Sequence, residues 1–465
     1  MTAFPRLGVS ALVGVAILAL SFASGAPSDL VVDGDKIVAQ LTKLALFSDD
    51  TDARDGMTAV TRVLFTATDM EARGYTKQLM TAAGLTIRED ALGNIYGRLA
   101  GSDPKAGSVL TGSHNDAIPL AGMYDGTVGV IAAIEALAAL QAAGYKPKRP
   151  LEVLMFTSEE PTRFALSCVG SRAMAGTLSP EYLKSKLDVN GTDFLTAANA
   201  VGYGGKSYEA ILKDALVPKG QVDFFVELHI EQGPELEAQG LDIGIVSAIA
   251  APAALSVEFH GDGGHAGAQL MPLRNDAGLA AAELALAVEA ATLATEDPNS
   301  VGTTGKVLIS PGAVNSVPRD AVLGIDIRDT DGARRDTIVA KVLAAAAEIA
   351  ARRNVRHSVS IVNQDPPAAC SDEVQAAAKR ASDSLGLKSR SMVSRAYHDS
   401  LFMARIAPTA MIFIPCRNGW SHRPDEFSTP EAIAAGAHVL ALTIADLSGG
   451  IWGAPPAAGV VKSEL

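Results

Sequence analysis

The feature that most constrains the fold is an alternation of apolar strand-like runs with apolar helical stretches. The run VLTGSHND precedes the helical stretch GTVGVIAAIEALAALQAAG, and LEVLMFTSEE and DFFVELHIEQG follow it. Each strand-like run ends in polar residues. Strands separated by helices favour parallel pairing, and ligands gather where the carboxyl ends of such strands meet. We therefore predict an α/β fold with a mixed, mostly parallel sheet flanked by helices.

A different pattern interrupts this alternation between residues 249 and 365. Two long helical stretches, RNDAGLAAAELALAVEAATLA and GARRDTIVAKVLAAAAEIAARR, lie among strand-like runs in a βαββαβ-like order. This order suggests an inserted α+β domain. We predict that it divides a catalytic domain into residues 30–248 and 366–450, followed by a tail at 451–465.

Further elements follow from hydrophobic spacing. Helical spacing covers Asp35 to Leu46 and Ala59 to Ala83, and ALGNIYGRLAG has the pattern of a strand or hairpin. After the insert, DEVQAAAKRASDSLG predicts a helix, TAMIFIPC a strand, and STPE the capped start of a last helix.

The composition is that of a globular protein with a large core, since 48 % of the 465 residues are hydrophobic and 20 % are charged. A net charge of −13 argues against a nucleic-acid partner, which needs a basic surface. We expect a small-molecule substrate instead. The three cysteines, Cys168, Cys370 and Cys416, cannot all pair internally, and we expect mostly buried thiols.

The chain ends carry targeting patterns. Residues 1–25 contain one Arg, an apolar run from Leu7 to Ala23 and small residues, as in a secretory signal peptide; an uncleaved membrane anchor is the alternative. We expect no later membrane span and no stable membrane association after cleavage. The terminal KSEL differs at one position from the Lys-Asp-Glu-Leu retention address. Together they predict the endoplasmic reticulum lumen or secretory pathway, with a bacterial periplasm as the alternative.

Residues able to bind metal ions follow the predicted strands. They are His114 in GSHND, Asp125 in YDG, Glu159 and Glu160 in SEEPTRF, His229 in LHIEQG, and His422 in GWSH. One such histidine is more often structural than ligating, but several at successive strand ends favour a metal centre. A carboxylate that bridges two divalent ions supports hydrolysis, and this ligand set suits zinc or manganese. Glu159 is left free to act as general base, since neighbouring strand side chains point apart.

The ordered motifs SHND, YDG, SEEPTRF, ELHIEQGPELE, GGHAG, RNDAG and AYHDS, with a final SH, resemble the dinuclear amidohydrolases of the M20 peptidase type. The similar branch acts on ureido compounds. Within it, SEEPTRF, IAAPA, MPLRNDAGLAAAELALAVE, VNQDPPA and SRAYHDSLFMARI most resemble the plant-type ureidoglycolate amidohydrolases. The resemblance covers nearly everything from Ile37 to Leu447.

This resemblance implies an M20-like catalytic domain with an inserted lid and dimerisation domain. It implies two divalent ions per subunit, with manganese favoured and zinc possible, bound by His114, Asp125, Glu160, His229 and His422. It gives Glu159 the role of base. It also implies substrate contacts by Gln232, His265, Asn315, Arg328, Tyr397 and His398. In the implied homodimer, His265 reaches the neighbouring subunit's site and has a catalytic role in stabilising the oxyanion.

The residues themselves leave alternatives open for these contacts. Arg328, at the end of LGIDIRD, can clamp a substrate carboxylate or pair with a neighbouring aspartate. Asn315 in GAVNSVP can be a turn residue, and the glycines around His265 suit either a ligand or a tight turn. Gln232 can be an ordinary loop hydrogen-bonding residue.

Tyr397 is the strongest indication of substrate. Relatives that hydrolyse carbamoyl amino acids tend to have Ser-Gly-Ala-Gly-His-Asp where this chain has SRAYHD. The phenol offers a hydroxyl to a substrate hydroxyl or carboxylate and takes volume from larger side chains; a purely structural tyrosine is the alternative. His398, backed by Asp399, is expected to contact substrate or to support a ligand, unless it is a core histidine.

We therefore predict a hydrolase that cleaves the terminal ureido group of (S)-ureidoglycolate, giving glyoxylate, ammonia and carbon dioxide in purine and allantoin catabolism. An N-carbamoyl-L-amino-acid hydrolase or allantoate amidohydrolase is the alternative, because such enzymes share the metal site. A non-catalytic metal-binding paralogue is a remote third hypothesis, since no ligand or base is missing from the sequence.

Overall fold

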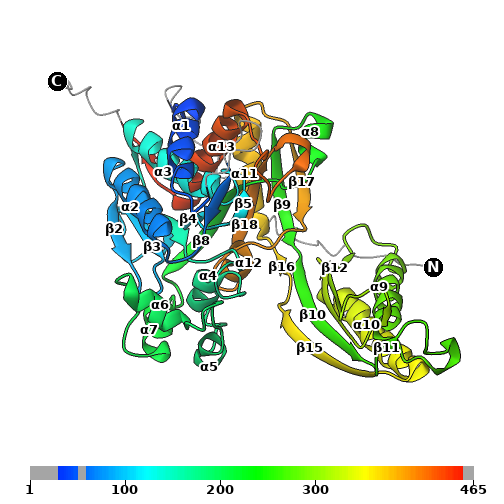
Figure 1. Cartoon of the computed structure of the whole chain (residues 1–465). Helices are drawn as coiled ribbons and strands as arrows, with labels where there is room; N and C mark the ends of the chain where they lie inside the picture. Colours follow the sequence, from blue (N-terminus) through cyan, green and yellow to red (C-terminus); the bar gives the residue numbers. More distant parts are fainter. Residues whose placement is uncertain (1–29, 51–58, 454–465) are drawn as a thin grey trace, which may run out of the picture.

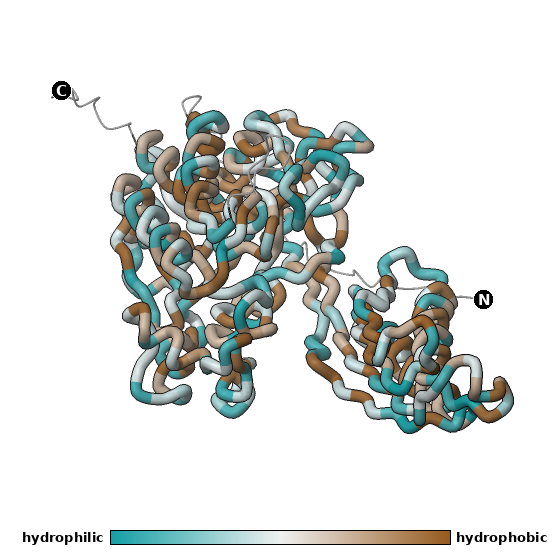
Figure 2. Tube along the Cα trace, in the orientation of Figure 1, coloured by the Kyte–Doolittle hydropathy of each residue, from teal (hydrophilic) through white to brown (hydrophobic). Residues whose placement is uncertain are grey.

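The computed structural model describes residues 30–50 and 59–453, which form two lobes (Figure 1). The predicted signal peptide and the KSEL terminus lie outside these residues. Each lobe has its own hydrophobic stretches (Figure 2).

The larger lobe is built on a nine-stranded sheet of order β16-β9-β18-β8-β4-β7-β3-β2, with β17 beside β9. The strands are β2 (Thr86–Glu89), β3 (Ile95–Leu99), β4 (Ser108–His114), β7 (Leu151–Phe156), β8 (Val222–Ile230), β9 (Ile243–Ile249), β16 (Ala368–Ala369), β17 (Ser389–Ser394) and β18 (Thr409–Ile414). The central strands β7, β4, β8 and β18 are parallel, and antiparallel pairs flank them. The predicted α/β fold with a mixed sheet is confirmed.

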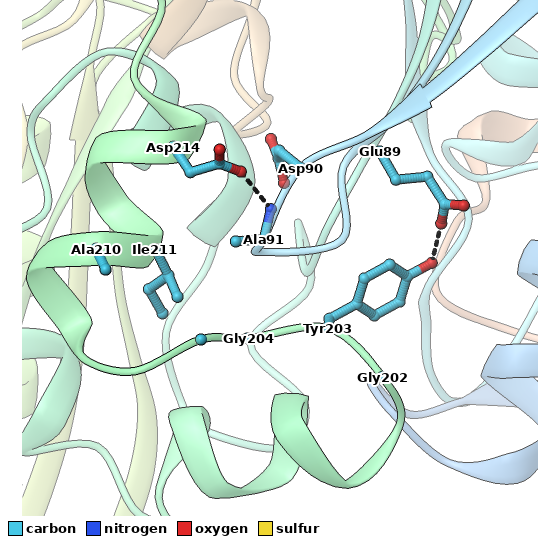
Figure 3. A pocket seen from close by; sticks show the side chains of 10 residues that line it. Glu89, Asp90, Ala91, Gly202, Tyr203, Gly204, Ala210, Ile211 and Asp214 are labelled. Carbon is cyan, nitrogen blue, oxygen red and sulfur yellow. Dashed lines mark hydrogen bonds between the residues drawn. The ribbon is translucent and has the colours of Figure 1, made fainter.

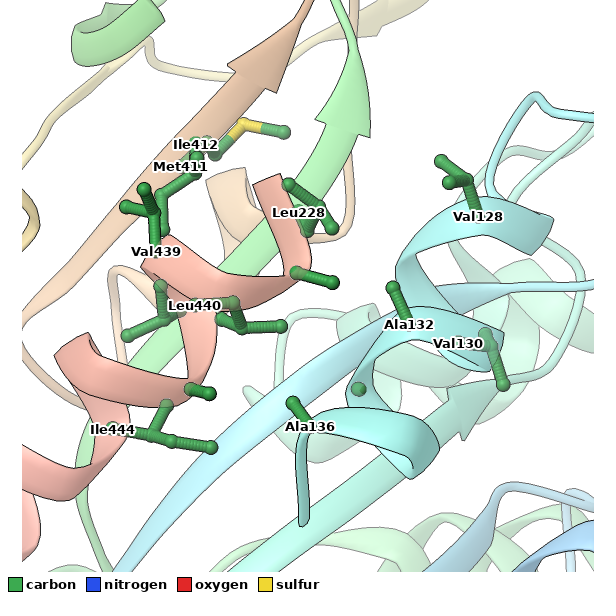
Figure 4. Packing of buried hydrophobic residues seen from close by; sticks show 14 of the residues in the cluster. Val128, Val130, Ala132, Ala136, Leu228, Met411, Ile412, Val439, Leu440 and Ile444 are labelled. Atoms are coloured by element: carbon green, nitrogen blue, oxygen red, sulfur yellow. The ribbon is translucent and has the colours of Figure 1, made fainter. Parts of the chain in front are cut away.

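Helices cover both faces of this sheet because its strands are buried on both sides. Val153 and Met155 of β7 belong to one core, whereas Leu154 and Phe156 belong to the core on the other face. The first face carries α1 (Gly34–Ala45), α2 (Ala67–Ala82), α3 (Thr127–Ala142), α11 (Asp372–Ser384) and α13 (Pro430–Ser448). Helices α3 and α13 pack there over β8 and β18 (Figure 4).

Shorter elements complete the lobe. The helices are α4 (Val169–Met174), α5 (Pro180–Lys184), α6 (Phe194–Ala200), α7 (Tyr208–Ala215), α8 (Glu235–Gln239), α12 (Ser400–Met403) and the 3-10 turn η2 (Arg417–Gly419). Two small sheets pair β1 (Val60–Arg62) with β5 (Ala117–Ala121) and β6 (Tyr145–Lys146) with β19 (Ile451–Trp452).

The smaller lobe is the inserted domain, with a separate core. Its antiparallel sheet has the order β12-β14-β10-β15. The elements are β10 (Ala251–His260), β11 (Gly264–His265), η1 (Met271–Leu273), α9 (Ala277–Leu293), β12 (Val301–Ser310), β13 (Ser316–Val317), β14 (Asp320–Asp329), α10 (Gly332–Arg353) and β15 (Arg356–Gln364). Side chains from α9 and α10 pack on one face of this sheet. The lobe joins the large sheet through Ala250, after β9, and through residues 365–367, before β16.

The predicted helix from Ala59 to Ala83 is wrong in its first part. Residues Val60–Arg62 form β1, because β-branched residues suit a strand and β5 supplies a pairing partner. The helix begins at Ala67, after Thr66 caps it by accepting a hydrogen bond from the Asp69 amide. The predicted cap of the last helix is confirmed, since Thr429 accepts from the Ala432 amide.

Two further expectations concern buried residues. The three cysteines are free and buried, as predicted. Helix α13 is long and apolar enough to cross a membrane by length and composition alone, contrary to the expectation for later segments. However, 61 % of its apolar window is buried in the protein, as in a core helix.

Candidate dinuclear metal centre

The predicted metal ligands come together from five separate segments. His114 is the last residue of β4 and His229 lies near the end of β8. Asp125 precedes α3, Glu160 follows β7, and His422 precedes α13. All five side chains line one cavity of about 430 Å³, together with Glu159, Gln232, Arg328, Tyr397 and His398.

Asp125 lies at the centre of this cluster. Its Oδ1 is 3.1 Å from His229 Nε2 and 3.8 Å from His114 Nε2. Its Oδ2 is 3.1 Å from His422 Nε2, which in turn is 3.2 Å from Glu160 Oε1. Burial alone would raise the pKa of Asp125, but hydrogen bonds with His229 and His422 outweigh burial and hold that pKa well below its usual range. The carboxylate therefore stays ionised.

The ligand atoms form two groups that share Asp125. His114, Asp125 and His229 make one group and Asp125, Glu160 and His422 the other, with ligand atoms within 4.8 Å of one another in each. One oxygen of the shared carboxylate faces each group. Imidazole nitrogens and carboxylate oxygens around a shared carboxylate fit a pair of divalent ions such as zinc or manganese.

A third group of possible ligands, Glu227, His229 and His398, is already engaged in hydrogen bonds. Glu227 accepts from Ser113 Oγ at 2.7 Å and from the hydroxyl of Ser400. A carboxylate that two hydroxyls hold in place is better explained as support for the strand ends than as a metal ligand.

Gly126 explains why the YDG motif needs glycine. Its φ is 65°, and a Cβ at this position would lie 2.3 Å from His114 Nε2. A larger residue would displace the imidazole that faces Asp125.

Asp116 supports the cluster, although sequence reasoning missed it. The backbone carbonyl of Asp116 lies 3.0 Å from His114 Nδ1, so this nitrogen carries the proton and Nε2 faces Asp125. The Asp116 carboxylate accepts hydrogen bonds from the amides of Glu159 and Glu160. Burial raises the pKa of this carboxyl to about 6. Its place two residues after His114 is a signal that could have identified it.

Glu426, which lies far from Asp125 in the sequence, supports it through hydrogen bonds. Its Oε1 accepts from the amides of Tyr124 and Asp125 at 2.9 and 3.0 Å, and its Oε2 accepts from Ser421 Oγ at 2.9 Å. Burial, followed by the charge of Asp125, raises the pKa of Glu426 to about 7. Nothing in the local sequence around Glu426 pointed to this role.

Glu159 lies beside the cluster without being its nearest ligand. Its Oε2 is 3.8 Å from His114 Nε2, and its Oε1 accepts from Cys168 Sγ at 3.4 Å. Burial, followed by the charges of Glu160 and Asp399, raises the pKa of Glu159 well above its usual range. A carboxylate that holds a proton easily suits general acid–base chemistry.

Two predicted substrate contacts are held by neighbouring side chains. Gln232 Nε2 donates to Asp125 Oδ2 at 2.9 Å and to Ser421 Oγ at 3.0 Å. Arg328 lines the cavity, but it also pairs with Asp326 at 2.8 Å, which was the alternative interpretation. Its Nη1 donates to the Arg395 carbonyl at 3.2 Å.

The prediction that Asp399 backs His398 is wrong. His398 Nε2 lies 3.0 Å from Ser394 Oγ, whereas Asp399 accepts from the hydroxyl of Ser171. The backbone turns into α12 directly after Asp399, so the two side chains take different partners. Burial, followed by the charge of His229, lowers the pKa of His398 well below its usual value. His398 is therefore a neutral wall residue, with its ring centroid 4.6 Å from that of His229.

His265 and Asn315 are absent from the described cavity lining. The Ala266 amide donates to the Asn315 carbonyl at 2.9 Å, and β11 pairs with β13, so these residues lie together in the inserted domain. Both are exposed. One chain alone therefore does not bring Asn315 to Arg328.

A second cavity, of about 470 Å³, lies away from the metal cluster between the β2–β3 turn, the loop 202–205 and helix α7 (Figure 3). Several of its polar groups already have hydrogen-bond partners. Asp214 accepts from the Ala91 amide at 2.8 Å, and Tyr203 donates to Glu89. These hydrogen bonds make the cavity a weaker candidate for a ligand than the metal cluster.

The mixed sheet, the inserted domain and a carboxylate shared by two ligand groups define a hydrolase of the dinuclear M20 type. The chain belongs to peptidase family M20/M25/M40, whose model matches residues 112–446. It is 53 % identical to ureidoglycolate hydrolase of Arabidopsis thaliana over 424 residues, covering 90 % of this chain and 88 % of that protein.

Other proteins are also similar to most of this chain. The crystal structure of AtUAH in complex with (S)-hydroxyglycine has a TM-score of 0.83 and 52 % identity, and the match covers 90 % of this chain and 99 % of that one. The chain is also 39 % identical to an N-carbamoyl-L-amino acid amidohydrolase of Geobacillus stearothermophilus over 391 residues, covering 84 % of this chain and 94 % of that protein.

Proposed function

We propose that this chain hydrolyses the terminal ureido group of (S)-ureidoglycolate, giving glyoxylate, ammonia and carbon dioxide. The observation that carries the proposal is the Asp125 carboxylate shared by two ligand groups, with Glu159 beside it in a cavity that also holds Arg328 and Tyr397. The substrate assignment is supported by the 53 % identity to ureidoglycolate hydrolase. A second AtUAH structure is a complex with glyoxylate, which is the expected final product.

Two divalent ions would bind to the shared carboxylate, with manganese favoured through the family resemblance and zinc possible. His114 and His229 would hold one ion, and Glu160 and His422 the other. When bound, such a pair polarises a substrate carbonyl and lowers the pKa of water.

The remaining steps belong to the chain's own side chains. Arg328 binds the substrate carboxylate, which replaces Asp326 as its partner. Glu159 accepts the proton of the attacking water and returns it to the departing nitrogen. Neutral His398 and the Tyr397 ring close the wall of the cavity and exclude other water molecules.

The active form proposed is a homodimer in which His265 and Asn315 reach the partner's cavity. The outer strand β12 pairs only with β14 among the described strands, and it exposes Val307, Leu308 and Ile309. An open apolar edge of this kind favours pairing with a second chain. His265 from the partner would then stabilise the oxyanion that forms during attack.

Ammonia release from ureidoglycolate, allantoate and N-carbamoyl-L-amino acids, measured in parallel on metal-restored protein, tests the proposal. We expect the highest kcat/KM on ureidoglycolate. A higher kcat/KM on allantoate or on any carbamoyl amino acid would assign the chain to the corresponding alternative, and no turnover of any of them would favour the non-catalytic hypothesis.

The location proposed for the protein is the endoplasmic reticulum lumen or secretory pathway. The N-terminal apolar run and the KSEL terminus support this proposal. So does Asn190 of the Asn-Gly-Thr glycosylation triplet, which is exposed. N-terminal sequencing of the mature protein tests it, since a chain that starts at Met1 or Thr2 would contradict signal cleavage.

A further inference from the structure

Tyr397 is held at the cavity wall by two charged residues that do not line the cavity. Its hydroxyl donates to Asp365 Oδ2 at 2.7 Å and accepts from Arg172 Nη2 at 2.7 Å. Arg172 and Asp365 also form a two-pronged ion pair, at 2.6 and 3.2 Å. Their side chains are only 7 % and 13 % exposed, so solvent screens this pair weakly.

These bonds limit what the phenol can offer to a substrate. A tyrosine hydroxyl has one proton to donate and two lone pairs. The hydroxyl proton is donated to Asp365, and one lone pair accepts a hydrogen bond from Arg172. The hydroxyl therefore cannot donate to a substrate carboxylate, contrary to the expectation from sequence. What remains is mainly the volume of the ring.

The Tyr397 ring is also in contact with a neighbouring aromatic side chain. It meets the ring of Phe402 edge to face, with centroids 5.8 Å apart. The Arg172 guanidinium lies 4.4 Å from the centroid of the same Phe402 ring. Arg172 therefore holds the tyrosine both directly and through its neighbour.

The charged pair also connects Tyr397 to the inserted domain. Arg172 belongs to α4 of the catalytic domain, whereas Asp365 directly follows β15 of the insert. The backbone carbonyl of Asp365 accepts from Arg335 of α10, which also donates to the Ala251 carbonyl at 3.3 Å. The ring is thus fixed at the point where both linkers leave the catalytic domain.

The position of Arg328 indicates which part of a substrate meets the ring. Its guanidinium contacts the carbonyl of Arg395, two residues before Tyr397. Arg328 and Tyr397 line the same cavity, so a substrate carboxylate bound to Arg328 would bring its α-carbon toward the Tyr397 ring. In ureidoglycolate this carbon bears a hydroxyl, whereas in a carbamoyl amino acid it bears the amino-acid side chain.

We propose that Arg172 and Asp365 are positioning residues that hold the Tyr397 ring as a wall, limiting the substrate's α-substituent to about the size of a hydroxyl. This inference rests on the proposed function. The proposal attributes substrate selectivity to a buried ion pair that does not line the cavity. The quantity to measure is the ratio of kcat/KM on ureidoglycolate to kcat/KM on N-carbamoyl-L-methionine.

Asp365→Asn and Tyr397→Phe should each lower this ratio by at least about 10-fold, since loss of a fitted wall admits a larger apolar group. Tyr397→Gly should lower it further. In the Tyr397→Gly background, Asp365→Asn should change the ratio no more, because the pair acts only through the ring. The ratio should fall less in Arg172→Lys than in Arg172→Met, because lysine keeps the positive charge that faces Asp365.

A matched control is Asp223→Asn, which breaks the ion pair with Arg149 at 2.8 Å and should leave the ratio unchanged. Thermal melting identifies variants that do not fold, and Tyr397→Phe tests the same contact with the pair intact. The proposal is overturned if Asp365→Asn and Tyr397→Phe leave the ratio unchanged. It is also overturned if Asp365→Asn lowers the ratio equally with and without the ring.

The proposed function can fail separately from this inference. Wild-type protein that prefers N-carbamoylglycine to ureidoglycolate would refute the ureidoglycolate assignment alone, whereas a preference for N-carbamoyl-L-methionine would also overturn the wall. The same set of variants, measured as the ratio of N-carbamoylglycine to N-carbamoyl-L-methionine turnover, would then still test the wall.

Discussion

The metal cluster of the catalytic domain and the His265–Asn315 end of the inserted domain differ in completeness. In the first, five predicted metal ligands from separate segments line one cavity, and Asp116 and Glu426 hold them through hydrogen bonds. In the second, two exposed residues make hydrogen bonds within their own domain in the described part of the chain. The difference shows that one chain assembles the proposed ion-binding half of the site, whereas the proposed oxyanion-binding residues lie outside that chain's own cavity.

Removing the base should have the largest effect. In Glu159→Gln the carboxylate can no longer accept a proton, so we expect kcat to fall by about 10²- to 10⁴-fold, with metal content unchanged. Steady-state kinetics and elemental analysis measure these quantities. Glu181→Gln, which alters an exposed carboxylate on α5, is the control and should keep full activity. Near-normal turnover in Glu159→Gln would dismiss the base assignment.

Truncating His265 tests whether the two halves meet across a dimer. We expect His265→Ala to lower kcat by about 10²- to 10³-fold, as for loss of one oxyanion donor. Metal content should not change, because His265 lies outside the cavity of its own chain. If the loss came from misfolding, the melting temperature would fall together with kcat.

Mixing the two inactive variants sharpens the same comparison. A mixed dimer of Glu159→Gln and His265→Ala contains one complete site, so random subunit exchange should restore roughly a quarter of wild-type activity. Ammonia release after exchange measures this recovery. Equal mixtures that stay inactive, despite proven exchange, would place His265 outside the partner's site.

Weakening the support behind the ligands should have a smaller effect. Glu426→Gln keeps an acceptor for the amides of Tyr124 and Asp125 but removes a carboxylate. We expect metal affinity to fall by about 10- to 100-fold, as for other residues that orient ligands. Competition with a chelator measures the affinity. Unchanged affinity would show that Glu426 supports only the backbone.

The sequence predicted this half of the site because parallel strands deliver their ends to one edge of a sheet. His114 and His229 could be placed from strand pattern alone, and Asp116 could have been found from its spacing. Glu426 and Asp365 could not, because their partners lie far away in the chain and only the folded sheet brings them close. The misplaced start of α2 has the same origin, since pairing with β5 decides it.

Substituting Arg395 should have the smallest effect on activity. It tests only the contact between the two lobes, because Arg395 joins them. Its guanidinium donates to Glu235 of α8 and to Asn299 of the insert, both at 3.0 Å, while its carbonyl holds Arg328. Arg395→Ala should loosen the insert without touching the ligands. We expect KM for ureidoglycolate to rise by about 3- to 10-fold with kcat nearly unchanged, as when ground-state binding alone is lost.

Arg390 supplies the matched control for this change. It also pairs with Glu235, at 3.3 Å, but its other hydrogen bonds stay within the catalytic domain. Arg390→Ala should therefore leave KM unchanged. A similar rise in KM for both variants would mean that Glu235, and not the link between the lobes, is responsible. A fall in kcat in Arg395→Ala alone would mean that the insert takes part in chemistry within its own chain, and the contrast between the two regions would no longer hold.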